Sequence, residues 1–332
     1  MNNNKIVSVI VPAYNEINFI EHCINSMLSQ DYPKELYEIL IVDGMSTDGT
    51  REKVLEIAKT NRNLHLVDNP NRTVPFALNE GIKKSRGDVV VIISAHGFAD
   101  PDFVRKNVET LDRVGADCVG GRIDCIANSD SANTIMLAMR STFGIGDSAL
   151  RENQKAGFVA HLAYPCYNKD VFDKIGYFDE EMVKNQDDEF NFRLRKFGGT
   201  IYFNPEIRSY YYVRPSLKAL WRQYFVYGYY KVRNFQKHPG QLSLRHFVPA
   251  GFVSINLFSL FLVPMSVRFG YIALTVVSLY LTAALINSVS ICRRVGFRYF
   301  YLLPITFATL HVSYGSGFLK GLIKFFPKWF KK

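Results

Sequence analysis

A short apolar run that stops abruptly at a carboxylate limits what this chain can fold into. The stretch from Tyr37 to Thr50 reads YEILIVDGMSTDGT, in which Ile39-Leu40-Ile41-Val42 precedes Asp43 and a series of turn residues. A continuous apolar run bounded by turn residues is typical of a strand buried on both faces, as in a parallel sheet. Asp43 is then expected at the carboxyl end of that strand, the edge at which open α/β sheets hold ligands.

Two further stretches repeat this pattern. The run 7–11 ends at Pro12-Ala13-Tyr14-Asn15-Glu16, and the run 89–93 ends at Ser94-Ala95-His96. Asp43 alone could simply cap a loop, because strands often end in Asp. Three buried strands that deliver polar groups to one edge instead indicate a site for a polar ligand.

Helical patterns separate the apolar runs. Segments 19–30, 50–59, 75–85 and 103–114 have helical spacing, and 64–67 and 117–126 are further strands. Strand and helix therefore alternate at short spacing, which predicts βαβ units and a mostly parallel sheet flanked by helices. The segment 129–164, with Gly144, Gly146 and Gly157, is either a lid or a long connection.

The charge is divided unevenly along the chain. The 332 residues include 40 Lys and Arg and 30 Asp and Glu, a net charge of +10. From Arg208 onward there are 17 Lys or Arg and no Asp or Glu, so the first 207 residues carry a net charge of −7. An acidic N-terminal part is thus joined to a purely basic tail.

Cysteine content and the N-terminus indicate a cytosolic setting for the first part. The five cysteines form no C-x-x-C pair, which argues for reduced thiols and against a zinc site or a disulfide framework. No apolar segment precedes the first strand, so no signal peptide is expected.

The basic tail begins with an aromatic segment. Residues 216–238 read SLKALWRQYFVYGYYKVRNFQKH, which mixes large aromatics with Lys and Arg. Such a composition fits an interfacial helix on an anionic membrane, or a nucleic-acid groove with stacking aromatics. The apolar stretches that follow favour the membrane, so nucleic acid is not an expected partner.

Three apolar stretches follow. Residues 247–267 and 270–292, about 21 and about 23 residues without charge, are each long enough to span a bilayer, and only Arg268 and Phe269 separate them, which predicts a tight hairpin. The third, 299–319, is interrupted by Pro304 and His311. Three full crossings would put the lysine-rich C-terminus outside, against the positive-inside rule, so the third stretch is expected to be re-entrant or interfacial.

Two groups of polar residues have both a structural and a chemical interpretation. Asp187, Asp188 and Glu189 are either helix N-terminal charges favoured by the macrodipole or include a general base. His96 is either a hydrogen-bonded structural residue or, with Asp100 and Asp102 close behind, a ligand for a divalent metal. Imidazole suits Mn²⁺ better than Mg²⁺.

The motifs VSVIVPAYNE, EILIVDGMSTDGT, ALNEGIKKSRGDVV and DDEFNFRL, taken together, resemble the family-2 glycosyltransferases. The resemblance covers roughly residues 5–210. It implies a GT-A fold and an inverting enzyme that uses a nucleotide-sugar donor. The tail resembles that of membrane-attached members that build exopolysaccharides, such as the succinoglycan-assembly glycosyltransferases.

The resemblance also implies roles for individual residues. Asp187 falls where the family places its catalytic base, and Asp43 where it contacts the nucleotide base, typically uracil. Asp48 would support that loop, and Arg193 would help on the acceptor or phosphate side. The remaining nucleotide-side positions are Pro12, Tyr14, Glu16, Arg72 and Asn79.

Two departures from the family pattern concern charge. The family's Asp-x-Asp, which contacts ribose and metal, is here Ser94-Ala95-His96, so both acids are absent and His96 would be the one metal ligand, for Mn²⁺ or Mg²⁺. The Glu before the catalytic Asp is here Gln186.

These observations predict a transferase that moves a sugar from a nucleotide-sugar, expected to be a UDP-sugar, to an acceptor expected to be polyprenyl-diphosphate-linked, in polysaccharide biosynthesis. The expected parts are a GT-A domain over 1–210, interfacial helices over 211–246 and a membrane region over 247–332. The protein is expected to be a multi-pass protein of the inner (plasma) membrane with a cytoplasmic catalytic domain. A weak or inactive membrane scaffold is the alternative. A processive synthase is less favoured, because a Q-x-x-R-W motif is absent.

Overall fold

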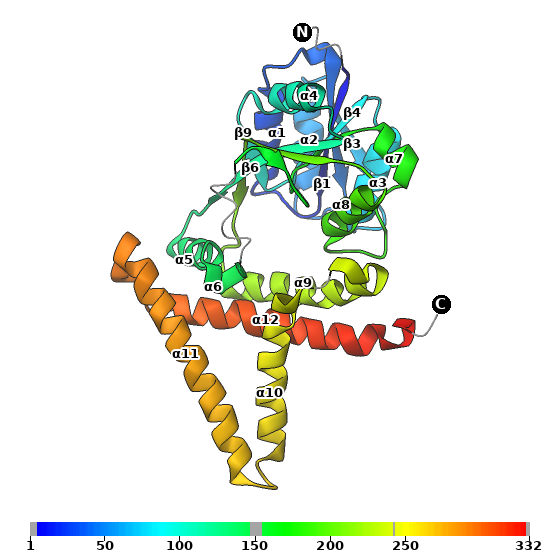
Figure 1. Cartoon of the computed structure of the whole chain (residues 1–332). Coiled ribbons are helices and arrows are strands. Elements are labelled where there is room, and N and C mark those ends of the chain that lie inside the picture. Colours follow the sequence, from blue (N-terminus) through cyan, green and yellow to red (C-terminus); the bar gives the residue numbers. More distant parts are fainter. Residues whose placement is uncertain (1–4, 147–154, 242, 330–332) are drawn as a thin grey trace. The chain divides into compact units, whose positions relative to one another are not determined.

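A computed structural model describes residues 5–146, 155–241 and 243–329 of the chain (Figure 1). The chain divides into two compact units. The first comprises residues 1–125 and 152–212, and the second comprises residues 126–151 and 213–332.

One half of the sheet in the first unit is parallel, as predicted. Its strands run in the order β3-β2-β1-β4. Val9 of β1 lies opposite Ile39 of β2 on one side and Val91 of β4 on the other. The strands of this half are β1 (Val7–Ala13), β2 (Tyr37–Asp43), β3 (Leu64–Asp68) and β4 (Val89–Ile92).

The other half of the sheet departs from the predicted parallel arrangement. The order continues as β8-β6-β9-β5, with β7 paired to β9, and the registered pairs here are antiparallel. The α/β class is confirmed, and the sheet is mixed because β8 runs antiparallel to β4. These strands are β5 (Gly97–Ala99), β6 (Cys118–Ile126), β7 (Gly157–Phe158), β8 (Cys166–Asn168) and β9 (Ile201–Tyr212).

Helices cover both faces of the sheet. Alternate residues of a strand point to opposite faces, so Val9 packs in one apolar cluster and Ile10 in the other. All seven residues of β2 are buried, as expected for a strand covered on both sides. The helices are α1 (Ile20–Leu28), α2 (Thr50–Ala58), α3 (Val74–Lys84), α4 (Phe103–Val114), α7 (Asp170–Ile175) and α8 (Gln186–Lys196).

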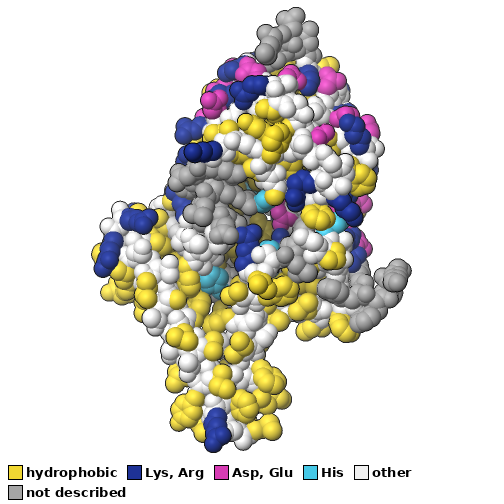
Figure 2. Space-filling model, in the orientation of Figure 1, with side chains coloured by type: hydrophobic (Ala, Val, Ile, Leu, Met, Phe, Trp, Pro, Cys, Tyr) yellow, Lys and Arg dark blue, Asp and Glu magenta, His cyan; other side chains and the backbone are white. Residues whose placement is uncertain are grey.

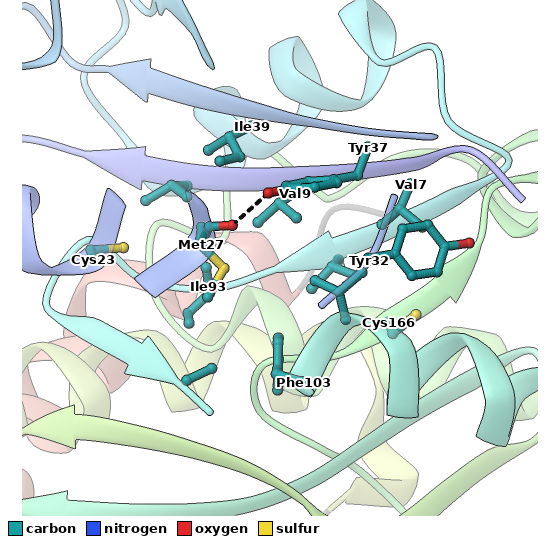
Figure 3. Close-up of a cluster of buried hydrophobic side chains, with 14 of the residues drawn as sticks. Val7, Val9, Cys23, Met27, Tyr32, Tyr37, Ile39, Ile93, Phe103 and Cys166 are labelled. Carbon is teal, nitrogen blue, oxygen red and sulfur yellow. Dashed lines mark hydrogen bonds between the residues drawn. The ribbon is translucent and has the colours of Figure 1, made fainter. Parts of the chain in front are cut away.

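Figure 3 shows the cluster that fixes α1 against the sheet. The ring of Tyr37 is fully buried at the start of β2, and its hydroxyl donates a hydrogen bond to the carbonyl oxygen of Met27 at 3.1 Å. Burial of aromatic and aliphatic side chains here anchors the end of α1 beside the start of β2.

The segment 129–164 is more regular than its glycines indicated. It contains α5 (Asp130–Met139) and α6 (Thr142–Ile145), each capped by a serine hydroxyl, from Ser129 and Ser141. The capping serines are the sequence signal for these helices, and the glycine content obscured it. Residues 147–154 of this segment lie outside the described residues, and 126–151 belong to the second unit.

The second unit is helical. Besides α5 and α6 it contains α9 (Leu217–Lys237), α10 (Val248–Leu262), α11 (Val267–Val295) and α12 (Leu302–Phe325). Two stretches, Leu244–Leu262 and Val267–Val295, are long and apolar enough to cross a membrane by length and composition.

The turn between these two stretches differs from the predicted one. Arg268 and Phe269 lie inside the first turn of α11, and residues 263–266 make the turn. Ser266 caps α11 by accepting a hydrogen bond from the backbone N–H of Arg268. A charged residue does not end a helix, whereas the Pro264 and Ser266 pair marks a stop and a start.

Candidate functional site

The loops after β1 and β2 are joined by hydrogen bonds at the carboxyl edge of the sheet. The backbone N–H of Asn15 donates to Ser46 Oγ at 2.8 Å, and the N–H of Thr47 donates to Asn15 Oδ1 at 2.9 Å. The N–H of Glu16 donates to Thr50 Oγ1 at 2.9 Å. Two loops that are 30 residues apart in sequence therefore form one rigid rim.

Asp43 holds the second loop from inside. Its carboxylate is fully buried, and it accepts hydrogen bonds from Ser46 Oγ at 2.5 Å and Ser46 N–H at 2.9 Å. Arg51 Nη1 lies 2.9 Å from Asp43 Oδ2, while its Nη2 contacts Asp68 at 2.8 Å. Because this carboxylate is fully buried, contact with a nucleotide base would require the loop to move.

Asp48 supports the same loop, as the resemblance implied. Its carboxylate accepts hydrogen bonds from Thr50 Oγ1 at 2.6 Å and from the backbone N–H of Ile17 at 3.1 Å. Loss of water around the carboxyl works against ionisation, but these hydrogen bonds outweigh it and hold the pKa of Asp48 below its usual value.

Tyr14 and Arg72 lie on either side of Gly44. A Cβ atom at Gly44 would be 3.1 Å from the Tyr14 ring and 3.3 Å from the Arg72 Cα, so a larger residue would crowd both. The ring of Tyr14 is 45% exposed, and Arg72 is exposed. Pro12 lies within β1, opposite Val42. A flat, polar ligand would fit here, because an accessible aromatic ring and an exposed arginine lie next to a glycine.

Strained backbone gathers around this edge. Among the described residues, five non-glycine residues have a positive φ: Asn15, Met45, Arg72, Tyr164 and Asn185. The first three lie on the loops that follow β1, β2 and β3, and Asn185 precedes α8. Each left-handed residue costs of the order of 1–3 kcal/mol, least for Asn, and such residues collect where function fixes the backbone.

Glu16 and His96 meet at this edge. Glu16 Oε1 lies 2.9 Å from His96 Nδ1, and both side chains are mostly buried, at 18% and 15% exposed. A carboxylate that holds one ring nitrogen fixes the ring and leaves the other nitrogen, Nε2, to bind a ligand.

The described residues do not build a complete metal site here. In the part of the chain that the structure describes, no three His, Cys, Asp or Glu side chains group as metal ligands, so the predicted set of His96, Asp100 and Asp102 does not form. Asp102 instead lies 2.7 Å from Lys106. One imidazole nitrogen with a carboxylate behind it fits only an ion whose other ligands come from substrate oxygens and water.

A short segment before β8 links β4 to α8. The hydroxyl of Ser94, in the position of the missing first acid, is hydrogen-bonded to the hydroxyl of Tyr164. His161 Nδ1 lies 3.2 Å from Asp188 Oδ1 in the first turn of α8. The first turn of α8 is therefore tied to the edge that carries His96.

Asp187 lies beside this contact. Its Oδ1 accepts the backbone N–H of Asp188 at 2.9 Å, and the side chain is half-buried. The free N–H groups of a helix N-terminus favour the carboxylate form. A half-buried carboxylate on the first turn of a fixed helix is suitably placed for a general base.

Arg193 is bonded to the protein itself. Its Nε and Nη2 each lie 3.0 Å from a carboxylate oxygen of Glu189, and its Nη1 and Nη2 also donate to the carbonyl oxygens of residues 175, 176 and 177. All five N–H groups of the guanidinium thus have acceptors. Arg193 fastens the loop before α8 in this structure, and an acceptor or phosphate contact, as the resemblance implied, would break one of these bonds.

Asn79, on α3, also holds the loop before α8 through hydrogen bonds. Its side chain, 3% exposed, donates to the carbonyl oxygen of Phe178 at 3.0 Å and accepts the N–H of Phe178 at 3.0 Å. A second donor bond reaches Glu180 at 3.0 Å. Asn79 therefore holds the loop that leads to α8. It also lines a cavity of about 420 Å³ with residues 177–181.

Three residues at the site were missed by sequence reasoning. Arg51 had a signal, because a cation in the first turn of a helix opposes the macrodipole and needs an anionic partner. His161 and Tyr164 lie in an irregular segment, and their contacts with Asp188 and Ser94 depend on tertiary pairing of β4 with β8.

Comparison with known proteins gives consistent matches. The family described as glycosyl transferase family 2 matches residues 8–176. Over 326 residues, the chain is 33% identical to a dolichyl N-acetyl-alpha-D-glucosaminyl phosphate 3-beta-D-2,3-diacetamido-2,3-dideoxy-beta-D-glucuronosyltransferase of Methanococcus voltae, covering 96% of this chain and 97% of that protein. It is 27% identical to the succinoglycan biosynthesis protein ExoA of Rhizobium meliloti (strain 1021), covering 96% and 95%.

A solved structure has the same fold. The mannosyltransferase PcManGT from Pyrobaculum calidifontis, in complex with GDP-Man and Mn²⁺, superposes with a TM-score of 0.60 at 20% identity, over 97% of this chain and 88% of that one. This likeness confirms the predicted GT-A fold, with long apolar helices at the C-terminus. That relative holds Mn²⁺ together with its nucleotide sugar.

Proposed function

This chain belongs to glycosyl transferase family 2, an inverting family, and we propose that it transfers a sugar from a nucleotide-diphosphate donor, a UDP-sugar, to a lipid-linked acceptor at a membrane surface. The observation that carries this proposal is the gathering of polar groups from β1, β2, β4 and α8 at one edge of the sheet, on loops fixed in left-handed backbone. The relatives named above act in glycan and exopolysaccharide synthesis.

The donor nucleotide is assigned to the rim formed by Tyr14, Gly44 and Arg72. The exposed ring of Tyr14 offers a stacking surface, and Arg72 is an exposed cation next to it. Asp43 and Asp48 act from behind by fixing this rim, so that the base meets a preformed surface. A direct bond from Asp43 to the base is compatible with this assignment only if the loop moves to expose the buried carboxylate.

The acceptor is assigned to the side of α8. Asp187 takes the proton from an acceptor hydroxyl as its oxygen attacks the anomeric carbon, and the bond from that carbon to the diphosphate breaks on the opposite face. One displacement of this kind inverts the anomeric centre. His161 holds Asp188 and thereby the first turn of α8, while Asn79 and Arg193 hold the loop before it. A base fixed in this way meets the geometric requirement for proton transfer.

The leaving diphosphate needs positive charge. His96, held by Glu16, is the residue at the place where the family keeps its metal acids. When a divalent ion such as Mn²⁺ is bound, His96 Nε2 would hold it, and the ion would supply charge to the diphosphate oxygens. Arg72 is a further cation at this rim.

Membrane attachment is assigned to the second unit. The stretches Leu244–Leu262, which contains α10, and Val267–Val295, which is α11, are long and apolar enough to cross a bilayer, and the region from Arg208 onward contains no acid. We place the transferase domain and the C-terminus on the cytoplasmic side of the plasma membrane, because the flanking residues are cationic. Residues 211–246 then act as interfacial helices and 247–332 as the membrane region.

The alternative of an inactive scaffold is motivated by the loss of the acids at Ser94 and His96. A chain that only kept the fold would have no need for a half-buried Asp187 on a helix whose first turn and preceding loop are both held by side chains. Nucleotide binding without sugar transfer would favour the scaffold over the enzyme.

Transfer by proteoliposomes tests the assignment of Asp187. Labelled UDP-sugars are supplied with a polyprenyl-diphosphate-linked sugar, and transfer to the lipid phase is measured for wild type, Asp187→Asn and Asp173→Asn, an exposed acid on α7. Loss of a general base is expected to lower turnover by roughly 10²–10⁴-fold with UDP binding retained, while Asp173→Asn matches wild type. Unchanged turnover in Asp187→Asn would show that the base lies elsewhere.

A further inference from the structure

The helices α9 and α12 touch backbone to backbone along their length. A Cβ atom at Gly317 of α12 would lie 1.9 Å from the carbonyl oxygen of Phe225, and one at Gly228 of α9 would lie 2.1 Å from that of Tyr314. A third contact, at Gly321, would put a Cβ 2.6 Å from the carbonyl oxygen of Tyr229. Glycine at all three positions allows a contact that holds the two helices together as one layer.

The partner helix α9 is unsuited to a bilayer core. It contains no acidic residue and five cationic ones: Lys218, Arg222, Lys231, Arg233 and Lys237. Lipid hydrocarbon excludes such side chains unless they reach the headgroups. Because α12 is fastened to α9 through three glycines, α12 cannot cross the bilayer without separating from α9 or drawing these charges into it.

The other side of α12 carries an apolar stripe. Residues spaced by three or four along the helix share roughly a third of its circumference, and those away from α9 are exposed or half-buried. Ile305, Ile323 and, just beyond the helix, Phe326 are 52%, 78% and 62% exposed. The apolar members of this stripe are Leu302, Ile305, Val312, Ile323 and Phe326.

Lysines border this stripe rather than interrupt it. Lys320 and Lys324 are exposed, and the ammonium group of Lys320 lies 5.7 Å above the ring of Phe225 on α9. That lysine is therefore turned toward α9 and away from the stripe. An apolar stripe with lysines turned to one side is the pattern of a helix that lies at a bilayer surface.

Both ends of the α10–α11 hairpin meet this layer. At the start of α10, the carbonyl oxygen of Pro249 would lie 2.4 Å from a Cβ at Gly315 of α12. At the end of α11, Cys292 packs in one apolar cluster with Leu303 and Phe307 near the start of α12. Figure 1 shows α10 and α11 leaving α12 on the side away from α9, and Figure 2 shows hydrophobic side chains over the hairpin.

We propose that α9 and α12 form an in-plane layer on an anionic lipid surface, with the apolar stripe of α12 in the acyl boundary and only α10 and α11 crossing the bilayer. Two crossings return the chain to its starting side, so the C-terminal lysines lie on the same side as α9. The partner is a bilayer with anionic headgroups, which complement a region of the chain without acids. This inference rests on the membrane attachment proposed above and is independent of the transfer activity.

Depth measurements with spin labels test this layer in the full chain. Single cysteines replace Ile305, Val312 and Ile323 on the stripe and, as a spanning control, Leu279 in the middle of α11, in a chain whose five native cysteines are replaced and which still binds UDP. The proteins are placed in vesicles of phosphatidylcholine with phosphatidylglycerol. The relative accessibility of each label to oxygen and to a water-soluble nickel complex gives its depth.

The in-plane layer predicts one shallow depth for all three stripe labels and a much deeper position for Leu279→Cys. A graded profile, with Val312→Cys as deep as Leu279→Cys and the other two labels near opposite surfaces, would make α12 a third span and overturn the proposal. Labels shielded from both reagents, with spectra broadened by a neighbouring label, would show that a second copy of the chain covers the stripe, which also overturns it. A shallow Leu279→Cys would refute membrane attachment itself.

Discussion

Asp43 and Asp187 are carboxylates with different surroundings. Asp43 is closed off by Ser46 and Arg51, and its charge is matched within the protein. Asp187 is half-buried in the first turn of α8, and its Oδ1 accepts the backbone N–H of Asp188. The first arrangement stabilises a loop, whereas the second leaves a carboxylate placed to accept a proton.

The hydrogen bonds to Asp48 make the rim sensitive to acid. Because the folded-state pKa of Asp48 is lowered, its carboxylate stabilises the folded state above the unfolded pKa of about 3.9, and this contribution is lost as pH falls through the folded value. Asp48→Asn should therefore lower the unfolding temperature at pH 7, and the gap to wild type should narrow below about pH 4. Thermal unfolding between pH 7 and pH 3 measures this gap. A gap that stays constant would contradict the assigned role.

At the level of single residues, the sequence predicted the place of several site residues but not all of their contacts. Tyr14, Asp48 and His96 were found because each follows an apolar run, and the run sets which edge they reach. Asn79 and Arg193 were located on the right elements, but their bonds to the loop 175–178 depend on packing between α3, α7 and α8. A local sequence pattern does not indicate which backbone carbonyl oxygens will accept hydrogen bonds from an arginine.

At the level of elements, the loop before α8 is clamped by Arg193. Glu189 is buried beneath this arginine, and removal of one partner of a buried ion pair costs about 3–5 kcal/mol. Arg193→Met is therefore expected to lower the unfolding temperature strongly, with partial recovery in the double variant Arg193→Met/Glu189→Gln. Thermal unfolding in detergent gives the measurement, and Arg195→Met on the exposed face of the same helix is the control.

The result also decides between two roles for Arg193. A stable Arg193→Met protein that binds UDP and has lost transfer would show that this arginine contacts substrate, as the family resemblance implied. A destabilised protein would show that it holds the loop.

The contact between α9 and α12 offers a second test of element packing. Gly317→Ala places a methyl group against the Phe225 carbonyl and is expected to cost about 1–3 kcal/mol by overpacking. Gly251→Ala on α10, where a Cβ would meet nothing within 4 Å, should leave stability unchanged or raise it slightly. Thermal unfolding of both variants compares them. Equal effects of the two substitutions would argue against a close α9–α12 contact.

Helices and strands were predictable where the spacing of apolar residues and the helix-capping residues indicated the same boundaries. The parallel half of the sheet and its helices follow from alternating apolar runs, and the resemblance supplied the fold class. The antiparallel half did not follow, because β8 and β5 are only three residues long. The turn at 263–266 was displaced in the prediction because charge was taken as the boundary in place of the Pro264 and Ser266 signals.

Across the whole molecule, charge is divided unevenly along the chain. The acidic residues lie in the first 207 residues, and the chain from Arg208 onward is purely basic. An N-terminal part with a net charge of −7 is thus joined to a basic part that an anionic surface would attract. In the proposed function, the basic part stays at the membrane while the first part carries the nucleotide-sugar chemistry.

Calorimetric titration of the detergent-purified chain with UDP, with GDP as the competing nucleotide and with and without Mn²⁺, tests the central claim most directly. We predict one UDP site per chain, strengthened by Mn²⁺, with at least a tenfold loss of affinity in Tyr14→Ala, because that ring is the exposed surface beside Gly44. If Tyr14→Ala binds UDP with the wild-type affinity, the uracil ring does not stack on Tyr14 and lies elsewhere. Absence of binding for either nucleotide would contradict a nucleotide-sugar site at the carboxyl edge of the sheet.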